Sequence, residues 1–348
     1  MTKVQPVNQT WIDQAWARQH RLTKPPGALG ALEEAGVRLA AIQKTLRPEL
    51  GPGAVVVCAA DHGVAAEGVS AYPAEVTPQM VLNFLSGGAA INQIARASAA
   101  EVYVLDVGVR GEFPAHERLI QAKVREGSGN IAVEPAMTTA LAMRAFEAGA
   151  QAAERAIGEG ATLLAAGDMG IGNTTAAAAL TAALLGLPAE AVTGRGTGVD
   201  EAGYARKVAV VQRALSRASA TLGDLAKADP LEILAELGGL EIAAIAGVYL
   251  AGAENGLPLV VDGFPVTAGA LLAVRLEPAV RDYLFAGHCS LEPGHQRQLE
   301  ALSLRPLLNL GLRLGEGTGA VLAFPLLRAA AEVLSGMATF EEAGVSGS

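Results

Sequence analysis

The chain has 348 residues, 51% of them hydrophobic and only 4% aromatic, so it can bury a large core filled mainly by Ala, Leu and Val. Its formal net charge of −9 argues against a nucleic-acid partner or an anionic membrane surface, because both are usually bound through a basic patch. The length allows one large domain or two of ordinary size.

The N-terminal segment and the cysteines indicate the compartment. Residues 1–21 are polar and lack the pattern of a secretory signal. No uncharged apolar stretch reaches the roughly 18 to 20 residues that a membrane span requires. Cys58 lies inside one strand-like segment and Cys289 follows another, so neither needs a disulfide to explain it. We therefore expect a cytoplasmic protein with no membrane partner.

Short apolar runs alternate with longer helical patterns along the chain. In chain order, strands are expected at Ala54–Ala60, Val102–Val107, Ala161–Ala165, Leu259–Asp262, Tyr283–Ala286 and Leu307–Leu310. Helices are expected at Pro78–Ala97, Thr138–Ile157, Thr174–Leu185, Glu201–Leu222, Leu231–Glu254, Val266–Val274 and Gly319–Leu334. Strands that are apolar throughout, separated by helices long enough to cross back, predict an α/β fold with a parallel sheet and helices on both faces.

The domain organisation follows from this pattern. Residues 50–304 are expected to form a large α/β domain, whose ligands bind beyond the carboxyl ends of the strands. The two flanking segments, residues 1–49 and 305–348, look mainly helical and are expected to pack together as a smaller unit. The loop at residues 311–320 is expected to complete the site of the large domain.

A glycine-rich turn between the predicted strand Ala161–Ala165 and the next helix is the most informative segment. Gly170 and Gly172 allow backbone N–H groups to approach an anion closely, and residues 173–175 (Asn-Thr-Thr) can cap the new helix. The positive end of that helix favours negative charge, and Asp168 places one carboxylate beside it. Such turns also close ordinary strand-to-helix connections, so this segment alone leaves a phosphate site and a plain turn both open.

A second glycine-rich turn, at residues 311–320, repeats the design. It places Glu316 between two glycines, ahead of the helix-like run Val321–Leu334. The absence of bulky neighbours in the sequence suits a carboxylate that must reach a ligand. A solvated loop glutamate is the alternative interpretation of the same segment.

The phosphate-loop and dinucleotide motifs do not fit. The chain contains no G-x-x-x-x-G-K-[ST] sequence, which excludes a Walker-type phosphate loop. The spacing of Gly315, Gly317 and Gly319 superficially resembles a dinucleotide fingerprint, but the chain ends too soon after it for a βαβ unit. We therefore do not expect a nicotinamide oxidoreductase.

The histidines and Cys289 suggest a metal or a nucleophile only weakly. The spacing of Asp61-His62, His288-Cys289 and His295 matches no standard set of metal ligands, so no metal is expected. Cys289 beside His288 does not form a nucleophile–base pair, because adjacent side chains usually point apart. His62 is expected to be a hydrogen-bonding loop residue rather than a base.

Seven segments of the chain form an ordered set of longer motifs, namely Lys24–Glu33, Ala60–Val64, Glu75–Met80, Asn83–Asn92, Met169–Thr175, Gly194–Gly198 and Arg313–Gly319. From about Lys24 to the carboxyl end, the chain resembles the nicotinate-nucleotide:dimethylbenzimidazole phosphoribosyltransferase family. The resemblance implies that ribose 5-phosphate moves from nicotinate mononucleotide to 5,6-dimethylbenzimidazole. Inversion at C1′ would give α-ribazole 5′-phosphate and nicotinate, for the lower ligand of cobalamin. It further implies a homodimer with a Rossmann-like large domain, a small helical domain built from both chain ends, and no cofactor.

The resemblance also implies roles for particular residues. Glu316 matches the family's general base. The nucleotide side would comprise Gly170, Gly172, Asn173, Thr174, Lys207, Gly263, Ser290 and Arg313, with Lys207 and Ser290 as phosphate contacts. The benzimidazole pocket would comprise Tyr72, Glu75, Gln79, Met80 and Leu314. Lys207 has an alternative interpretation as a solvated helix lysine, and Met80 and Leu314 as plain core residues.

One position departs from the family pattern. Where the family usually has glutamate before the Met-Gly-Ile-Gly-Asn segment, this chain has Asp168, whose side chain is one methylene shorter. We expect Asp168 to be a second catalytic carboxylate of lesser weight, and a water molecule can bridge the shortfall in a polar pocket. Two other functions stay open: a glycosyltransferase for another azole, purine or phenol acceptor, and a non-catalytic nucleotide sensor.

Overall fold

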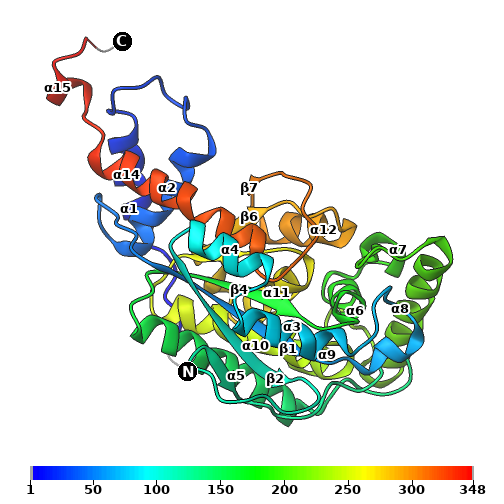
Figure 1. Ribbon diagram of the computed structural model, residues 1–348. Helices are drawn as coiled ribbons and strands as arrows, with labels where there is room; N and C mark the ends of the chain where they lie inside the picture. The colour runs from blue at the N-terminus through cyan, green and yellow to red at the C-terminus, as the bar shows by residue number, and fades with distance from the viewer. Residues whose placement is uncertain (1–2, 347–348) are drawn as a thin grey trace.

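The computed structural model describes residues 3–346 and contains a seven-stranded sheet in which all strands are parallel (Figure 1). The strands are β1 (Gly53–Ala60), β2 (Ala100–Gly108), β3 (Leu119–Gln121), β4 (Leu163–Met169), β5 (Leu259–Val261), β6 (Leu284–His288) and β7 (Pro306–Leu308). All six predicted strands are confirmed, with ends that shift by a few residues. The three-residue edge strand β3 was not predicted, because so short a run carries no period.

The strand order, β3-β2-β1-β4-β5-β6-β7, places the centre of the sheet at β1 and β4. The chain winds outward in one direction from β1 and in the other from β4, so the two carboxyl ends flank the point where the winding reverses. Open α/β sheets bind ligands at that point. β4 continues to Met169, four residues beyond the predicted end, and Asp168 therefore lies on the strand itself, paired with Cys58 of β1.

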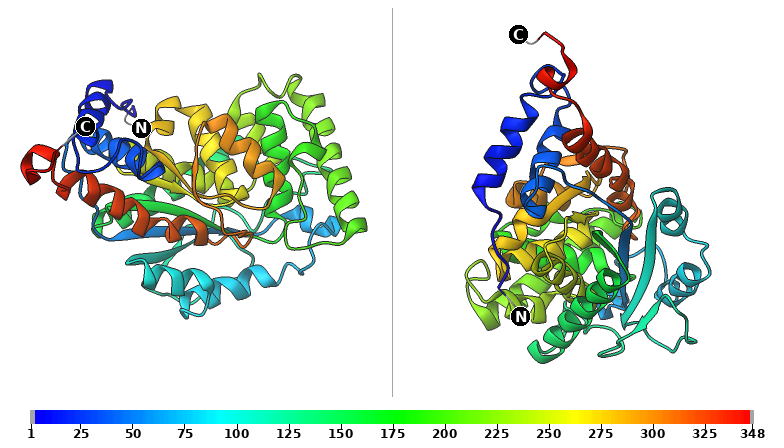
Figure 2. Two further views of the ribbon diagram at one scale, coloured as in Figure 1. Left: turned by 90° about the horizontal axis from the view of Figure 1, so that it is seen from above. Right: turned by 90° about the vertical axis from the view of Figure 1, so that its left-hand side faces the viewer.

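Helices cover both faces of the sheet, as predicted (Figure 2). One face packs against α5 (Thr139–Gly158), α10 (Leu240–Glu254) and α11 (Phe264–Leu276). The other face packs against α3 (Val76–Leu85), α4 (Ala90–Ala97) and α13 (Thr318–Leu322). The remaining helices are α1 (Gln9–Gln19), α2 (Ala31–Gln43), α6 (Asn173–Leu185), α7 (Ala189–Val192), α8 (Glu201–Leu222), α9 (Pro230–Leu237), α12 (Pro293–Leu302), α14 (Phe324–Gly336) and α15 (Phe340–Ala343), with 3-10 turns η1 (Gly63–Glu67) and η2 (Pro278–Tyr283).

Three of the predicted helices are each two helices in the structure. The segment 78–97 breaks at Gly87, whose φ of 77° is in the left-handed region. The segment 231–254 breaks at the Gly-Gly pair 238–239, between α9 and α10. The segment 319–334 breaks at Ala323, ahead of Pro325, which has no N–H to continue the ladder. The hydrophobic period continues across each break, so periodicity alone does not locate these breaks.

Helices from the two chain ends pack together beside the sheet (Figure 1). α1 and α14 both contact α2, and Ala15, Val37, Ala40 and Leu334 form a small core cluster there. β7 belongs to the sheet, although it lies within the 305–348 range assigned to the smaller unit. The division of the chain into two units stays a prediction.

One helical segment of the described residues, Thr318–Gly336, is long and apolar enough to cross a membrane, and half of it is buried in the fold. It comprises α13, which packs on the sheet, and α14, which packs on α2. Packing inside the protein therefore accounts for its apolar sequence.

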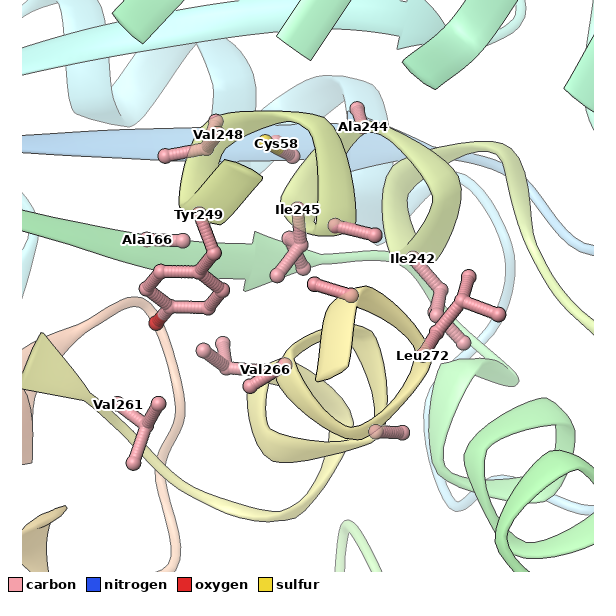
Figure 3. Close-up of a cluster of buried hydrophobic side chains, with 14 of the residues drawn as sticks. Cys58, Ala166, Ile242, Ala244, Ile245, Val248, Tyr249, Val261, Val266 and Leu272 are labelled. Carbon is pink, nitrogen blue, oxygen red and sulfur yellow. The ribbon is translucent and has the colours of Figure 1, made fainter. Parts of the chain in front are cut away.

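α10 is the central helix of the core (Figure 3). Its residues from Leu240 to Ala253 are buried without exception, as expected for a helix that is apolar on every side. In Figure 3, Tyr249 and Ile245 of α10 point toward Val266 of α11. The Tyr249 hydroxyl donates to the Val260 carbonyl at 3.0 Å, which satisfies its one buried polar group and ties α10 to β5.

α5 and α10 approach closely because each presents a glycine to the other. A Cβ built on Gly149 would lie 1.9 Å from the Ala244 carbonyl oxygen. A Cβ on Gly247 would lie 2.0 Å from the Phe146 carbonyl oxygen. Both obstacles are backbone atoms, so they cannot be relieved by a change of rotamer.

Gly247→Ala is therefore expected to lower the free energy of unfolding by about 1–3 kcal/mol, the usual cost of overpacking. Urea denaturation followed by far-UV circular dichroism measures this change. Gly158→Ala, near the exposed end of α5, is the matched control, because a Cβ there meets nothing within 4 Å. Equal midpoints for the two variants would contradict this account of the interface.

Candidate active site

A cavity of about 320 Å³ opens at the carboxyl end of the sheet, where the winding reverses. Its walls come from the loops after β4, β5 and β6, from the first turns of α3, and from the loop at 311–316. Most of the predicted site residues line it: Tyr72, Met80, Asp168, Gly170, Asn173, Thr174, Gly263, Ser290, Arg313, Leu314 and Glu316. The structure thus brings together the two glycine-rich turns, which are far apart in the sequence.

Four predicted site residues lie outside this lining. Glu75, the N-cap residue of α3, and Gln79, within α3, are both exposed. Gly172 faces η1, since a Cβ built on it would meet His62 and Val64 rather than the cavity. The fourth, Lys207, lies directly behind the wall.

The first turn is organised around Asp168. This side chain is 6% exposed, and one of its oxygens, Oδ2, accepts a hydrogen bond from the Asn173 amide at 2.7 Å. The prediction that residues 173–175 cap α6 is wrong, because the N-cap is Gly172 at a φ of 100° and no side chain caps the helix. Without a side-chain cap, the N-terminus of α6 stays open to an anion in the cavity.

The second turn holds Glu316 in a backbone conformation that non-glycine residues rarely adopt. Its φ is 64°, and it lies between Gly315 and Gly317, which also have positive φ. Its carbonyl packs against Gly167 so closely that a Cβ there would come within 2.3 Å. Such strain persists only where the surroundings fix it.

Asp262, the residue directly after β5, holds this turn in place. It is fully buried, and its two carboxylate oxygens accept hydrogen bonds from the backbone N–H groups of Ala320 at 2.9 Å and Gly317 at 3.2 Å. The carboxylate thus anchors both the turn and the start of α13 to the sheet. The sequence places Asp262 at the end of a predicted strand and in the loop that follows it, and it indicates no particular role for this carboxylate.

The Glu316 side chain is 6% exposed and lines the cavity, so the solvated-loop interpretation is wrong. Its Oε2 accepts a hydrogen bond from the Ile91 N–H at 3.3 Å, in the first turn of α4. Burial raises the pKa of this carboxyl above its usual value and Asp262 adds to the rise, while the Ile91 hydrogen bond opposes it. A base whose pKa is raised toward neutrality suits proton abstraction.

The second turn passes close to the other cavity carboxylate, Asp168. A Cβ built on Gly315, the residue before Glu316, would lie 3.0 Å from Asp168 Oδ1. This oxygen is buried and forms no hydrogen bond with the described residues. Burial raises the pKa of Asp168 well above its usual range, and the nearby Asp262 and Glu241 raise it further. Asp168 is therefore suited to hold a proton, while Glu316 is the better base.

Lys207 is fully buried in α8, so its interpretation as a solvated helix lysine is wrong. Its Nζ donates to Thr174 Oγ1 at 2.8 Å and lies against Gly196, and both of these residues line the cavity. Burial lowers the pKa of Lys207 to about 8, although the Glu292 carboxylate partly opposes this shift. The ammonium group therefore lies within reach of an anion at the open end of α6.

Several lining residues escaped prediction. Glu292 accepts a hydrogen bond from the Gly196 N–H at 2.8 Å and thereby fixes the Gly194–Gly198 turn. His288 lies 3.4 Å from Asp262, measured from Nε2 to Oδ1, and was weighed as a metal ligand and as a base beside Cys289, but not as a lining residue. Its position at the carboxyl end of β6, the same position that singled out Asp168, was the available signal.

Beneath the first turn lies a buried pair, His62 and Glu241, joined by a 2.8 Å contact between Nε2 and Oε1. A Cβ on Gly170 would collide with the Ala60 carbonyl oxygen at 2.3 Å, and the His62 ring lies 3.1 Å away. The prediction that His62 is a hydrogen-bonding loop residue is confirmed. Within residues 3–346, no group of three or more His, Cys, Asp or Glu side chains is arranged to hold a metal ion.

The fold and the cavity define a class of protein. A Rossmann-type strand order, an open helix N-terminus with a buried lysine, and two carboxylates at one end of a parallel sheet are suited to group transfer from a phosphorylated substrate. Residues 4–345 match the sequence profile of a family described as phosphoribosyltransferase. The chain is thus a phosphoribosyltransferase.

Relatives identify the particular family. The nicotinate-nucleotide–dimethylbenzimidazole phosphoribosyltransferase of Thermus thermophilus is 69% identical over 96% of this chain and 97% of its own length. The enzyme of the same name from Deinococcus radiodurans is 53% identical over 99% of this chain and 94% of its own. A crystal structure of CobT from Thermus thermophilus superposes with a TM-score of 0.94, at 67% identity, covering 97% of this chain and 100% of that one. The chain belongs to the nicotinate-nucleotide–dimethylbenzimidazole phosphoribosyltransferase family.

Proposed function

We propose that Glu316 is the general base in the reaction that this chain catalyses, the transfer of the phosphoribosyl group from nicotinate mononucleotide to 5,6-dimethylbenzimidazole. One observation carries the assignment: Glu316 is a buried carboxylate that lines the cavity and is fixed by Asp262 and Ile91. A general base that is held in a fixed position accelerates proton transfer through proximity and orientation when its carboxylate oxygen faces the reacting ring.

The chemistry requires little else from the protein. In nicotinate mononucleotide the pyridine nitrogen carries a positive charge, so the bond from C1′ to that nitrogen breaks without a strong general acid. Nicotinate leaves with the electron pair of that bond, and its ring nitrogen becomes neutral. One ring nitrogen of dimethylbenzimidazole forms the new bond to C1′, and the proton on its other nitrogen passes to Glu316. Attack opposite the leaving group converts the β-linked nucleotide to α-ribazole 5′-phosphate. The acceptor and nicotinate therefore occupy opposite sides of the ribose.

The phosphate of the nucleotide would bind at the first turn. The N-terminus of α6 faces the cavity, the Thr174 hydroxyl lines it, and the Lys207 ammonium group donates to that hydroxyl. A phosphate in contact with Thr174 gains the helix dipole and a charge-assisted hydrogen bond. Ser290 and Gly263 also line the cavity and would complete the nucleotide side.

The acceptor would bind between α3 and the loop at 311–316. Met80 is half-buried there, while Tyr72 and Leu314 are 55% and 58% exposed at the rim. The plain-core interpretation of Leu314 is therefore wrong. A flat, partly apolar wall fits a methylated bicyclic ring, but it also fits other azoles, purines or phenols, and a panel of acceptors separates these possibilities.

The direct test is release of nicotinate from nicotinate mononucleotide with and without dimethylbenzimidazole, with the nucleotide product identified by chromatography and its anomeric configuration by NMR. We expect release only with the acceptor, and the α-anomer as product. A nucleotide sensor would bind the mononucleotide and release no nicotinate with any acceptor. A β-linked product would contradict the placement of the two bases on opposite sides.

Asp168→Asn is expected to lower kcat less than loss of the Glu316 carboxylate does. The side chain keeps its size and its contact with Asn173, and in the enzyme Asp168 is the carboxyl group more suited to be protonated. Steady-state kinetics of the two variants, measured side by side, gives the ranking. A loss at Asp168 equal to that at Glu316 would show that their ranking is wrong.

We further propose that the chain acts as a homodimer in the cytoplasm. The family resemblance implies the dimer, and exposed apolar side chains in the loops around the cavity support it: Tyr72, Leu291, Leu310 and Leu314. The free thiols of Cys58 and Cys289 support a reducing compartment.

A further inference from the structure

A second cavity, of about 70 Å³, lies between α2, η2 and the first residues of β6 and β7. It shares no lining residue with the active-site cavity. Three arginines from three separate segments line it: Arg38 of α2, Arg281 of η2 and Arg305, which precedes β7. The lining includes one carboxylate, Glu34, and one hydroxyl residue, Ser303.

The three guanidinium groups keep free N–H donors. Arg38 donates through Nη2 to the carbonyls of Asp282 and Leu284, and Arg281 donates through Nε and Nη2 to those of Leu302 and Ser303. Nη1 of both residues, and the whole guanidinium of Arg305, form no hydrogen bond with the described residues. None of the three arginines forms an ion pair within 4.0 Å with any of the described residues.

The environment of Arg38 is unfavourable for unpaired positive charge. Burial lowers the pKa of Arg38 to about 10 and the neighbouring Arg281 adds to this shift, while the Glu34 and Asp282 carboxylates oppose it. Its guanidinium also lies over the Phe285 ring, 4.3 Å from the ring centre, which removes one face from water. Structural clamping of backbone carbonyls accounts for some of the donors on Arg38 and Arg281. Arg305 makes no contact of this kind; it is exposed where it lines the cavity and adds a third positive charge.

We propose that this cavity binds a small tetrahedral oxyanion of the phosphate class, separate from the phosphate of the substrate. The three guanidinium groups outnumber the two nearby carboxylates, Glu34 in the lining and Asp282 beside Arg38, so the cavity carries a net positive charge that complements an oxyanion. Guanidinium groups supplied by three separate segments of the chain can bond several phosphate oxygens, and the Ser303 hydroxyl can add a further donor. Free phosphate and the phosphate group of a larger metabolite share this chemistry, and the test separates them.

Arg305→Gln is the variant to test, because Arg305 is exposed and its loss removes no internal hydrogen bond. Arg47→Gln, which changes another exposed arginine outside the cavity, is the matched control. Both full-length variants are expected to keep the wild-type kcat in phosphate-free buffer, which separates this site from the proposed function.

Two measurements decide the question. Crystals soaked in selenate are expected to show an anomalous peak among Arg38, Arg281 and Arg305 in the wild type and in Arg47→Gln, and not in Arg305→Gln. Calorimetric titration with inorganic phosphate is expected to show a binding event that weakens about tenfold or more in Arg305→Gln only. Repeating the titration with ribose 5-phosphate separates the sources, since a cavity closed to larger groups admits only the free ion.

A selenate peak confined to the active-site cavity would overturn the proposal. So would equal phosphate affinity in the wild type and Arg305→Gln, because the three arginines would then serve only to clamp the backbone.

Discussion

Glu316→Gln is expected to lower kcat by roughly 10²–10⁴-fold, the usual contribution of a general base. Glutamine keeps the size of the side chain and its acceptor toward the Ile91 N–H, so the strained turn should stay in place. It cannot take the proton of the attacking ring. The dissociation constant for nicotinate mononucleotide, measured by calorimetry without acceptor, should stay near the wild-type value, because the proposed binding site of its phosphate is the other turn.

The pH profile gives an independent readout of the same residue. A base must be deprotonated to act, so wild-type kcat/KM should fall as the pH drops through the pKa of Glu316, which is raised above 4.5. This acidic limb should disappear in Glu316→Gln. Glu332→Gln, on the exposed side of α14, is the control and should keep both the rate and the limb. Near-normal turnover of Glu316→Gln, or an unchanged limb, would refute the role.

The architecture was largely predictable from the sequence, because the signals are local. An apolar run such as Val55–Ala60 is continuous since both faces of a parallel strand are buried, and the loops after such runs must meet at one edge. The same logic placed Asp168, Gly263 and Ser290 together. Local signals did not predict the breaks before α4, α10 and α14, because the hydrophobic period of one helix continues into the next.

The environment of each side chain was not predictable, because it depends on contacts between distant segments. The Glu316 side chain is held by Ile91, which lies 225 positions away in the chain. Its neighbour Gly317 is held by Asp262, which lies 55 positions from Gly317. Lys207 has the sequence context of a surface helix residue, and its burial arises from the packing of α8 against α6. Resemblance to the family supplied its candidate role, while only the structure supplied its neighbours.

Lys207→Met is expected to separate binding from stability. We expect the affinity for nicotinate mononucleotide to fall about 10- to 100-fold, the equivalent of a charge-assisted hydrogen bond of roughly 1.5–3 kcal/mol. The stability of the free protein should rise instead, because methionine fills the same buried space without a charge. The shift of the lysine pKa from 10.5 to about 8 means that burying the charged ammonium group costs about 3 kcal/mol of folding free energy. The net gain in Lys207→Met is smaller, because the variant also loses the hydrogen bond to Thr174.

The sign of the pH dependence follows from that shift. Because the folded-state pKa is the lower one, the unfolded chain binds more protons between pH 8 and 10.5, so the wild type should gain stability over that window. The penalty is fully present below pH 8, and there the stability advantage of Lys207→Met should be largest. Wild-type affinity for the nucleotide should decline above pH 8, as the ammonium group loses its proton.

Urea denaturation at pH 7 and pH 10, with calorimetric titration of nicotinate mononucleotide, measures both effects. Lys227→Met is the control, since that lysine is exposed and its surface ion pair with Asp224 contributes little. A variant with weakened binding and unchanged stability would mean that the buried ammonium costs nothing in the free protein. Wild-type affinity in Lys207→Met would show that the phosphate does not depend on Lys207. The open N-terminus of α6 would then bind it through backbone groups and Thr174 alone.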